Sequence, residues 1–209
     1  MVVHDMADSF TLLHTPFIQV NNAVQFVFGH LKGAGNGSKT GTDRDITDED
    51  WHRVWTTNVL GYSRCIKHAV KHMRGNSLSD HVFENEQGEG PCTIRAGSKG
   101  AIVNVASVSS YIAQPEFLPY NTTKGAVLQL TKCCAMDLAP EKIRVNAVCP
   151  GTIETQGSYG HMKAIGLGIE EGRKVFGDSC LMKRQAAPEE IASGVAFLAS
   201  DDSSFMTGE

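Results

Sequence analysis

The sequence predicts an α/β fold built on a parallel sheet. Short apolar runs rich in β-branched residues alternate with longer segments in which apolar residues recur at helical spacing. The runs are Phe17–Val20, Ala101–Val105 and Ile143–Val148, and the helical segments span 47–75, 120–138 and 187–200. Strands that alternate with helices are typical of parallel sheets, because parallel strands need long crossover connections. We expect one domain over residues 1–209, since a chain of 209 residues can bury a sizeable core.

Composition excludes several classes of protein. The hydrophobic fraction of 41%, the charged fraction of 20% and the net charge of -4 are ordinary for a soluble protein and argue against nucleic-acid or anionic-membrane partners. No apolar run approaches the ~20 residues of a membrane span. The start carries acidic residues and no basic region, so we expect no signal peptide. The cysteines show neither a CxxC pair nor zinc spacing, which predicts reduced thiols in a cytoplasmic protein without a metal.

The first part of the chain carries few signals. The run at Phe17–Val20 is followed by Asn21-Asn22-Ala23. Residues 33–41 read GAGNGSKTG, yet Ser38 interrupts the Gly-Lys-Ser/Thr of a P-loop and the glycine spacing is not that of a dinucleotide fingerprint. We expect this segment to be a flexible surface loop.

A helix is predicted to begin after Thr47. Thr47 can cap it, and three acidic residues follow in its first turn. Its apolar positions are Trp51, Val54, Trp55, Val59, Tyr62, Ile66, Val70 and Met73. His68 and His72 have metal-ligand spacing but no third ligand, so a polar helix face is expected there. Residues 76–99, rich in Asn, Ser, Glu and Gly, are expected to be disordered or a surface insertion before the next strand.

The segment Gly100–Lys124 contains the main candidate catalytic residues. A strand leads to Ser107, and Tyr120 and Lys124 stand on one face of the following helix at a spacing of i, i+4. An ammonium beside a phenol lowers the pKa of the phenol, which favours proton exchange with a substrate hydroxyl. The alternative is a buried tyrosine and a solvated lysine on an ordinary helix.

The runs IVNVAS and YNTTK resemble the short-chain dehydrogenase/reductase family, with Ser107 at the usual distance before Tyr120. This resemblance implies a Rossmann-like doubly wound sheet and hydride transfer between NAD or NADP and an alcohol or carbonyl substrate. It also implies that Tyr120 is the acid/base and that Lys124 lowers its pKa and holds the nicotinamide ribose. Ser107 would hold the substrate oxygen. Asn58, which matches the family's WxxxxxxN pattern from Trp51, would complete a proton relay.

The same resemblance implies where a cofactor binds. Asn21 and Ala23 match the family's Asn-Asn-Ala-Gly, with Val24 in place of the glycine. The segment after Ile143–Val148 resembles its Pro-Gly motif and the threonine that follows. The implied cofactor-binding residues are Asn21, Ala23, Tyr120, Lys124, Pro150, Gly151, Ile153 and Thr155. Asp5-Met6-Ala7-Asp8 is similar to an acidic turn that lies near the adenine ring, although a frayed terminus is an equal alternative.

The last third of the chain is expected to complete the fold. Residues 156–182 contain five glycines and correspond to a mobile segment that family members use as a substrate lid. The helix at 187–200 has proline at its first position and acids in its first turn. Residues 205–209 are interpreted as the lead-in to a last strand.

The family's glycine-rich Thr-Gly-x-x-x-Gly-x-Gly turn is not found in this sequence. We therefore expect a domain truncated at both ends, with an unpaired sheet edge beside Phe17–Val20. A catalytically inactive binding or oligomerisation partner is the alternative function, using the helices at 47–75 and 120–138, which resemble the family's subunit interfaces. A lyase or isomerase on the same scaffold is a weaker possibility.

Overall fold

The computed structural model describes residues 18–27, 45–78, 80–82 and 94–209. Its elements in chain order are β1 (Ile18–Asn21), α1 (Asp48–Trp55), η1 (Thr56–Leu60), α2 (Gly61–Met73), β2 (Asp80–Val82), β3 (Ile94–Ala96), β4 (Gly100–Val105), η2 (Val108–Ser110), α3 (Leu118–Leu138), η3 (Ala139–Glu141), β5 (Ile143–Val148), α4 (Gln156–Ala164), α5 (Ile169–Asp178), α6 (Pro188–Ala199) and η4 (Asp201–Ser203). The predictions for Asp5–Asp8 and for 33–41 lie outside the described residues. None of the described helices is long and apolar enough to span a membrane.

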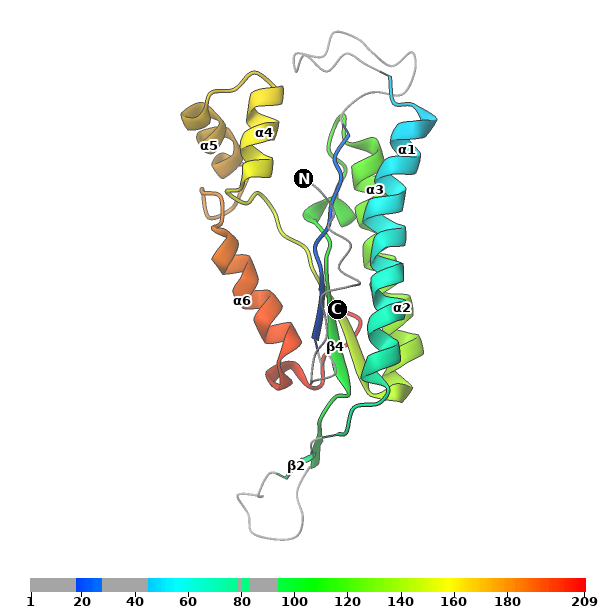
Figure 1. The fold of residues 1–209 in the computed structure, drawn as a ribbon. Helices are drawn as coiled ribbons and strands as arrows, with labels where there is room; N and C mark the ends of the chain where they lie inside the picture. Colours follow the sequence, from blue (N-terminus) through cyan, green and yellow to red (C-terminus); the bar gives the residue numbers. More distant parts are fainter. Residues whose placement is uncertain (1–17, 28–44, 79, 83–93) are drawn as a thin grey trace.

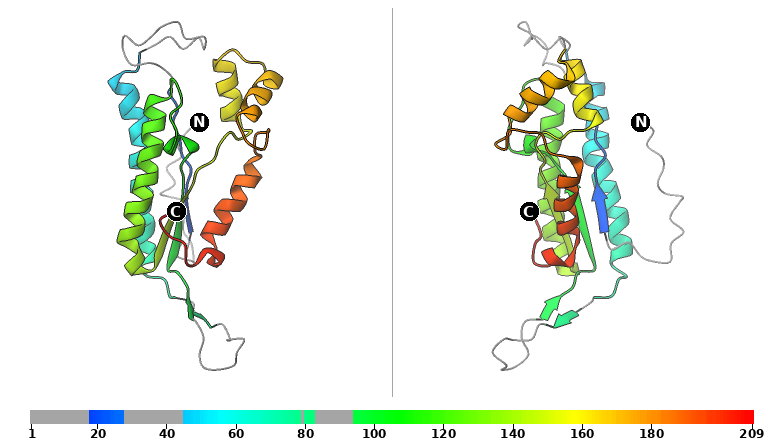
Figure 2. Two further views of the ribbon diagram at one scale, coloured as in Figure 1. Left: turned by 180° about the vertical axis from the view of Figure 1, so that it is seen from behind. Right: turned by 90° about the vertical axis from the view of Figure 1, so that its left-hand side faces the viewer.

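A parallel sheet with strand order β1-β4-β5 forms the centre of the fold and confirms the predicted α/β class. Asn21 of β1 pairs with Asn104 of β4, and Val105 of β4 pairs with Val148 of β5. Helices α1, α2 and α3 cover one face of the sheet and α6 covers the other (Figures 1 and 2). Among the described residues β1 is an edge strand.

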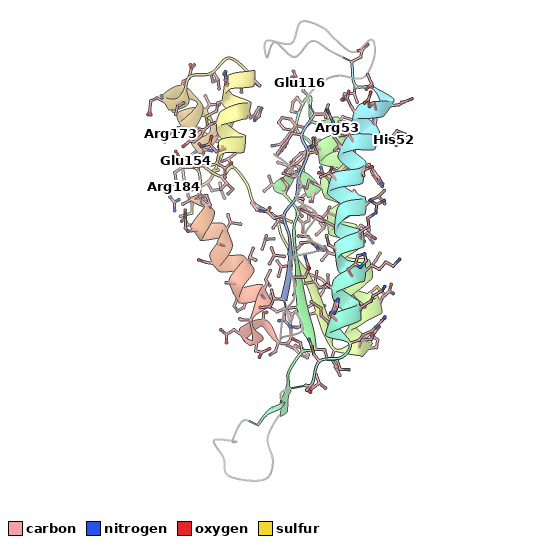
Figure 3. The ribbon with its side chains drawn as sticks, viewed as in Figure 1. His52, Arg53, Glu116, Glu154, Arg173 and Arg184 are labelled. Carbon is pink, nitrogen blue, oxygen red and sulfur yellow. The ribbon has the colours of Figure 1, made fainter. Side chains whose placement is uncertain are left out.

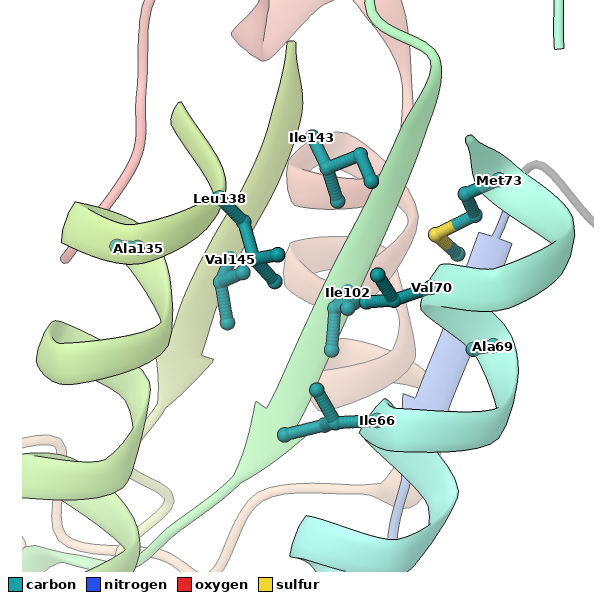
Figure 4. Packing of buried hydrophobic residues seen from close by; sticks show 9 residues of the cluster. All are labelled: Ile66, Ala69, Val70, Met73, Ile102, Ala135, Leu138, Ile143 and Val145. Carbon is teal, nitrogen blue, oxygen red and sulfur yellow. The ribbon is translucent and has the colours of Figure 1, made fainter. Parts of the chain in front are cut away.

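The main hydrophobic core lies between the sheet and the helices α2 and α3 (Figure 4). Its buried members are Ile66, Ala69, Val70, Met73, Ile102, Ala135, Leu138, Ile143 and Val145. The helical spacing in α2 and the β-branched residues of β4 and β5 bring these side chains to one layer, as the sequence pattern predicts. This core fixes the position of α3 along β4, and so it also positions the residues at the beginning of α3.

The predicted helix at 47–75 is interrupted by a π-helical turn. Thr47 Oγ1 caps α1 by accepting a hydrogen bond from Asp50 N at 3.2 Å, and Asp50 Oδ2 accepts one from Thr47 N at 3.1 Å. The helix then widens into η1 before α2 continues to Met73. Asn58 lies within η1. Wide turns of this kind are rare and are frequently found at functional sites.

Residues 76–99, expected to be disordered or a surface insertion, and residues 156–182, expected to be a mobile segment, both contain secondary structure. Within 76–99, β2 and β3 form an antiparallel ribbon, which protrudes from the end of the domain near the C-terminus of α2 (Figure 1). The placement of 76–99 as an insertion stays a prediction. Within 156–182 the chain forms α4 and α5, which lie beyond the carboxyl ends of the strands (Figure 1).

The polar residues of β5 are buried because both faces of this strand are covered. Arg144 donates hydrogen bonds of 2.8 and 2.9 Å to the carbonyls of Leu198 and Ser200 at the end of α6. The chain after η4 runs beside β5, where Gly208 N donates to Val145 O at 2.8 Å. The predicted lead-in at 205–209 therefore lies against the sheet.

Candidate active site

The carboxyl ends of the three parallel strands bring the predicted site residues to one edge of the sheet. Asn21 ends β1, Ser107 follows β4, and residues 149–155 follow β5. Val108 N donates to Pro150 O at 3.0 Å, which joins the last two segments. Helix α3 begins beside this edge and carries Tyr120 in its first turn. Ligands of open α/β sheets bind in this location.

Tyr120 and Ser107 form the polar centre of the site. Tyr120 is 9% exposed, and burial raises the pKa of its phenol, while a hydrogen bond with Ser107 opposes this shift. Ser107 is held in turn, because its Oγ accepts a hydrogen bond of 3.1 Å from Ser109 N. Residues 107–110 are called the serine turn. The hydroxyl of Ser110 donates to Lys124 O at 2.7 Å and so fixes the serine turn to α3. The tyrosine is therefore protonated at neutral pH, in contact with a fixed hydroxyl.

Lys124 is buried next to Tyr120 but bonds elsewhere. Its Nζ donates to Val105 O at 2.7 Å and lies 5.7 Å from the ring centroids of both Tyr120 and Tyr62. Burial lowers the pKa of Lys124 to about 8, and Cys149 partly offsets this shift. The expectation that Lys124 lowers the pKa of Tyr120 differs from the structure, in which desolvation dominates and the pKa of Tyr120 rises.

Asn58 is fully buried and joins three parts of the site. Its Oδ1 accepts from Gln25 N at 2.7 Å, and its Nδ2 donates to Gln25 O at 3.1 Å and to Thr123 Oγ1 at 3.0 Å. Thr123 Oγ1 also donates to Tyr120 O at 2.9 Å. The side chain of Asn58 thus fixes the segment after β1 against α3. Its predicted role in a proton relay stays a prediction.

A buried polar chain supports the strand ends. Asn21 Nδ2 donates to Asn104 Oδ1 at 2.8 Å, and Asn104 Nδ2 donates to Thr131 Oγ1 at 2.9 Å. These bonds link β1, β4 and α3 through side chains in the interior, where an unpaired amide would be costly. Ala23 lies exposed two residues beyond Asn21.

The remaining predicted cofactor residues lead away from Tyr120. Pro150 and Gly151 lie beside the serine turn, and a Cβ placed on Gly151 would be 4.0 Å from Val108 Cγ1. Ile153 pairs with Ala186, and Thr155 caps α4 by accepting a hydrogen bond from Ser158 N at 3.3 Å. These residues form the connection from β5 to α4, and their binding role stays a prediction.

Salt bridges hold α4 and α5 in place. Glu154 accepts hydrogen bonds from Tyr159 Oη at 2.6 Å and from Arg173 Nε at 2.7 Å. Arg184 binds Glu190 of α6 through two contacts of 2.6 Å. Figure 3 shows Glu154, Arg173 and Arg184 along one side of the molecule, from α4 and α5 to the start of α6.

Sequence reasoning missed several neighbours of Tyr120. Phe26 stacks on the Tyr120 ring with centroids 4.6 Å apart, and Phe117 meets it edge-on at 5.9 Å. Tyr62 donates a hydrogen bond of 3.1 Å to Val105 O, the acceptor that Lys124 also uses. Burial raises the pKa of the Cys149 thiol, which faces the backbone of Ser107. Phe117 and Cys149 adjoin recognised motifs, whereas Phe26 follows Val24 with no signal of its own.

Comparisons with known proteins agree with this arrangement. The family described as enoyl-(acyl carrier protein) reductase matches residues 89–209, more than half of the chain. The short-chain dehydrogenase anuF of Penicillium roqueforti is 44% identical over 76% of this chain and 54% of its own length. The chain spans about half the length of the curated relatives it matches.

Solved structures share the fold. Aldohexose dehydrogenase of Thermoplasma acidophilum aligns with a TM-score of 0.70 and 30% identity over 92% of this chain and 64% of its own. A xylitol dehydrogenase with bound NAD+ aligns with a TM-score of 0.67 and 30% identity over 91% of this chain and 65% of its own. The fold is Rossmann-like, and the named relatives are dehydrogenases. With the tyrosine, lysine and serine at the carboxyl edge of the sheet, the chain belongs to the short-chain dehydrogenase/reductase family.

Proposed function

We propose that this chain carries the proton-transfer site of a nicotinamide-dependent oxidoreductase that interconverts an alcohol and a carbonyl compound. The observation that carries the proposal is the contact between the hydroxyls of Tyr120 and Ser107 beside the buried ammonium of Lys124. Two hydroxyls that converge on one point can hold and protonate a single oxygen atom. The names of the relatives support oxidoreduction as the reaction class.

The donor set fits the nicotinamide end of NAD or NADP. Lys124 has three N–H donors, and among the described residues it gives one hydrogen bond, to Val105 O. The other two N–H groups of this buried ammonium are suited to the ribose hydroxyls of a bound cofactor. Backbone groups of Pro150 and Gly151 border the same space and would meet the carboxamide. The family's glycine-rich turn for the pyrophosphate is not found in the sequence, so the proposal covers the nicotinamide end of the site.

The residues of this chain account for the proton. In reduction, Ser107 and Tyr120 both donate hydrogen bonds to the carbonyl oxygen, and Tyr120 gives up its proton as that oxygen becomes a hydroxyl. A nicotinamide cofactor held by Lys124 would supply the hydride for the carbonyl carbon, so the reduction would balance against oxidation of that cofactor. Oxidation reverses these changes, and the alcohol proton passes to the Tyr120 phenolate. Because burial keeps the phenol protonated at neutral pH, the site is prepared to donate. Asn58 would contribute by fixing Thr123 and the turn that carries Tyr120.

Replacing Tyr120 tests the proposal. Tyr120→Phe removes one oxygen and should lower turnover at least ~10²-fold with cofactor affinity nearly unchanged, because general acid catalysis is lost. Tyr159→Phe is the matched control, since the Tyr159 hydroxyl donates its hydrogen bond to Glu154. The assay follows NAD(P)H absorbance with a panel of alcohols and ketones, in this chain and in a longer form that includes the glycine-rich turn. Equal activity in Tyr120→Phe and wild type would reject the assignment.

A second candidate is a binding or oligomerisation partner without catalysis. The helices that cover one face of the sheet leave apolar side chains exposed, including Met136, which is 79% exposed, and Trp55 and Leu60. Such residues are suited to a contact with a second copy of the chain through 47–75 and 120–138. Light scattering of the purified chain tests this candidate. A dimer that binds no NAD(P)H would favour the partner function over the enzyme.

A further inference from the structure

An unbroken series of aromatic rings runs from Tyr120 to the helices beyond the sheet. Phe26 stacks on Tyr120 with an interplanar angle of 25°, and Phe117 packs on Tyr120 from another side. Phe117 meets the ring of His161 edge-on at 5.0 Å, and His161 lies 5.3 Å from Phe176. The centroid distances are those that aromatic pairs prefer.

These rings come from four separate segments. Phe26 follows β1, Phe117 immediately precedes α3, His161 belongs to α4 and Phe176 to α5. Figure 1 shows α4 and α5 set apart from α3 on the same end of the molecule, so the contact of Phe117 with His161 spans the two parts. These four rings (the aromatic wall: Phe26, Phe117, His161 and Phe176) are joined into one series by the ring of Tyr120, which lies between Phe26 and Phe117.

The aromatic wall consists of three apolar rings and one imidazole, and all four are partly exposed. Phe26 is 42% exposed, and the other three rings are half-buried, so each retains surface for a ligand. Burial lowers the pKa of His161, while Glu116 opposes the shift.

Two of the nearby polar side chains bond to Gln114, while Asn121 Oδ1 has no hydrogen-bond partner among the described residues. Ser109 Oγ donates to Gln114 Oε1 at 2.6 Å, and Asn121 Nδ2 donates to Gln114 O at 2.9 Å. A ligand with several hydroxyl groups would leave most of them without hydrogen bonds against these rings, which disfavours binding. A ligand with a flat aromatic ring and a single reacting oxygen leaves no further hydroxyl group without a hydrogen bond.

We propose that the aromatic wall is the substrate-binding surface and that it selects alcohols and ketones whose reacting carbon is attached to an aromatic ring. The proposal rests on the proposed function, because it places the reacting oxygen at Tyr120 and Ser107. The substrate ring stacks on the wall while its benzylic oxygen reaches the two hydroxyls. This substrate class differs from the sugars and polyols named in several relatives.

The test measures ligand binding to the full chain without cofactor, by saturation-transfer NMR and calorimetry. The probes are 1-phenylethanol, its saturated analogue 1-cyclohexylethanol, and glucose. We expect 1-phenylethanol to bind roughly two- to tenfold more tightly than the cyclohexyl analogue, as stacking pairs are worth this much, and glucose to show no saturation. Equal affinity for the two alcohols, or tighter binding of glucose, would overturn the proposal.

Matched variants locate the binding surface. Phe26→Ala should weaken 1-phenylethanol binding roughly two- to tenfold, and so should His161→Ala, which removes the link to α4. Phe205→Ala is the control, because the ring of Phe205 is fully exposed near the C-terminus. Equal affinity in Phe26→Ala, His161→Ala and Phe205→Ala, with native circular dichroism, would contradict the proposed surface. Binding without turnover would reject the oxidoreductase while leaving the aromatic wall intact, so the two failures are distinguishable.

Discussion

At the scale of single residues, the electrostatics of the site centre on Lys124. This ammonium is 3% exposed and lies between two tyrosine rings, with Val105 O as its acceptor. The neighbouring groups Tyr120 and Cys149 both have raised pKa values, so at neutral pH neither is an anion that could neutralise it. The charge is retained at a cost in stability, which is common where a residue serves binding or catalysis.

Replacement of Lys124 should make the folded chain more stable at neutral pH. Burial lowers the pKa of Lys124 from 10.5 to about 8, which corresponds to a penalty on the order of 3 kcal/mol below pH 8. The penalty disappears as pH rises from 8 to 10.5, because the unfolded state then binds more protons than the folded state. Lys124→Met should thus raise the free energy of unfolding at pH 7, and the gain should shrink at pH 9.5.

Urea unfolding at the two pH values checks this prediction. The difference between variant and wild type cancels the titrating groups that do not interact with Lys124, such as Cys134. Val105 O keeps its hydrogen bond from Tyr62 in the variant. A variant less stable than wild type at pH 7, or a gain in the free energy of unfolding that is equal at both pH values, would show that the buried charge of Lys124 does not destabilise the folded chain.

At the scale of elements, the strongly patterned segments could be predicted and those decided by tertiary contacts could not. The bounds of β5 follow from its apolar alternation, and α3 begins at Leu118, two residues before the predicted start. The π-helical turn η1 could not be predicted, because the apolar residues across it, from Val54 to Tyr62, keep ordinary helical spacing. The residues of the aromatic wall share no local sequence pattern, so their contacts could be identified only from the structure.

Two glycines offer a matched test of how tightly the elements pack. A Cβ on Gly100 of β4 would lie 2.5 Å from Sδ of the buried Met73, whereas a Cβ on Gly125 of α3 would meet nothing within 4 Å. Gly100→Ala should therefore lose about 1–3 kcal/mol through overpacking. Gly125→Ala should gain about 0.5–1 kcal/mol, because alanine favours the helix. Thermal unfolding measures both, and a stabilised Gly100→Ala would contradict the packing of α2 on β4.

At the scale of the whole molecule, the parallel sheet gathers distant segments at one edge. Asn21, Ser107, Tyr120 and Pro150 converge because β1, β4 and β5 run in the same direction and α3 starts where they end. The helices α4 and α5 stand over the same edge and are tied to it by Glu154 and by ring contacts to Phe117 (Figure 1). The architecture thus brings the proposed acid/base residue Tyr120, the buried ammonium of Lys124 and the ring of Phe117 together at one edge of the sheet.

We propose that the carboxyl edge of the sheet binds the nicotinamide end of NAD(P) through Lys124. Titration of NADH and NADPH fluorescence into the full wild-type chain and into Lys124→Met tests it most directly. We predict a saturable change in fluorescence for the wild type and at least about tenfold weaker binding for the variant, because the ammonium that meets the ribose is gone. No saturable signal in the wild type at millimolar cofactor, or equal affinity in Lys124→Met, would contradict the claim.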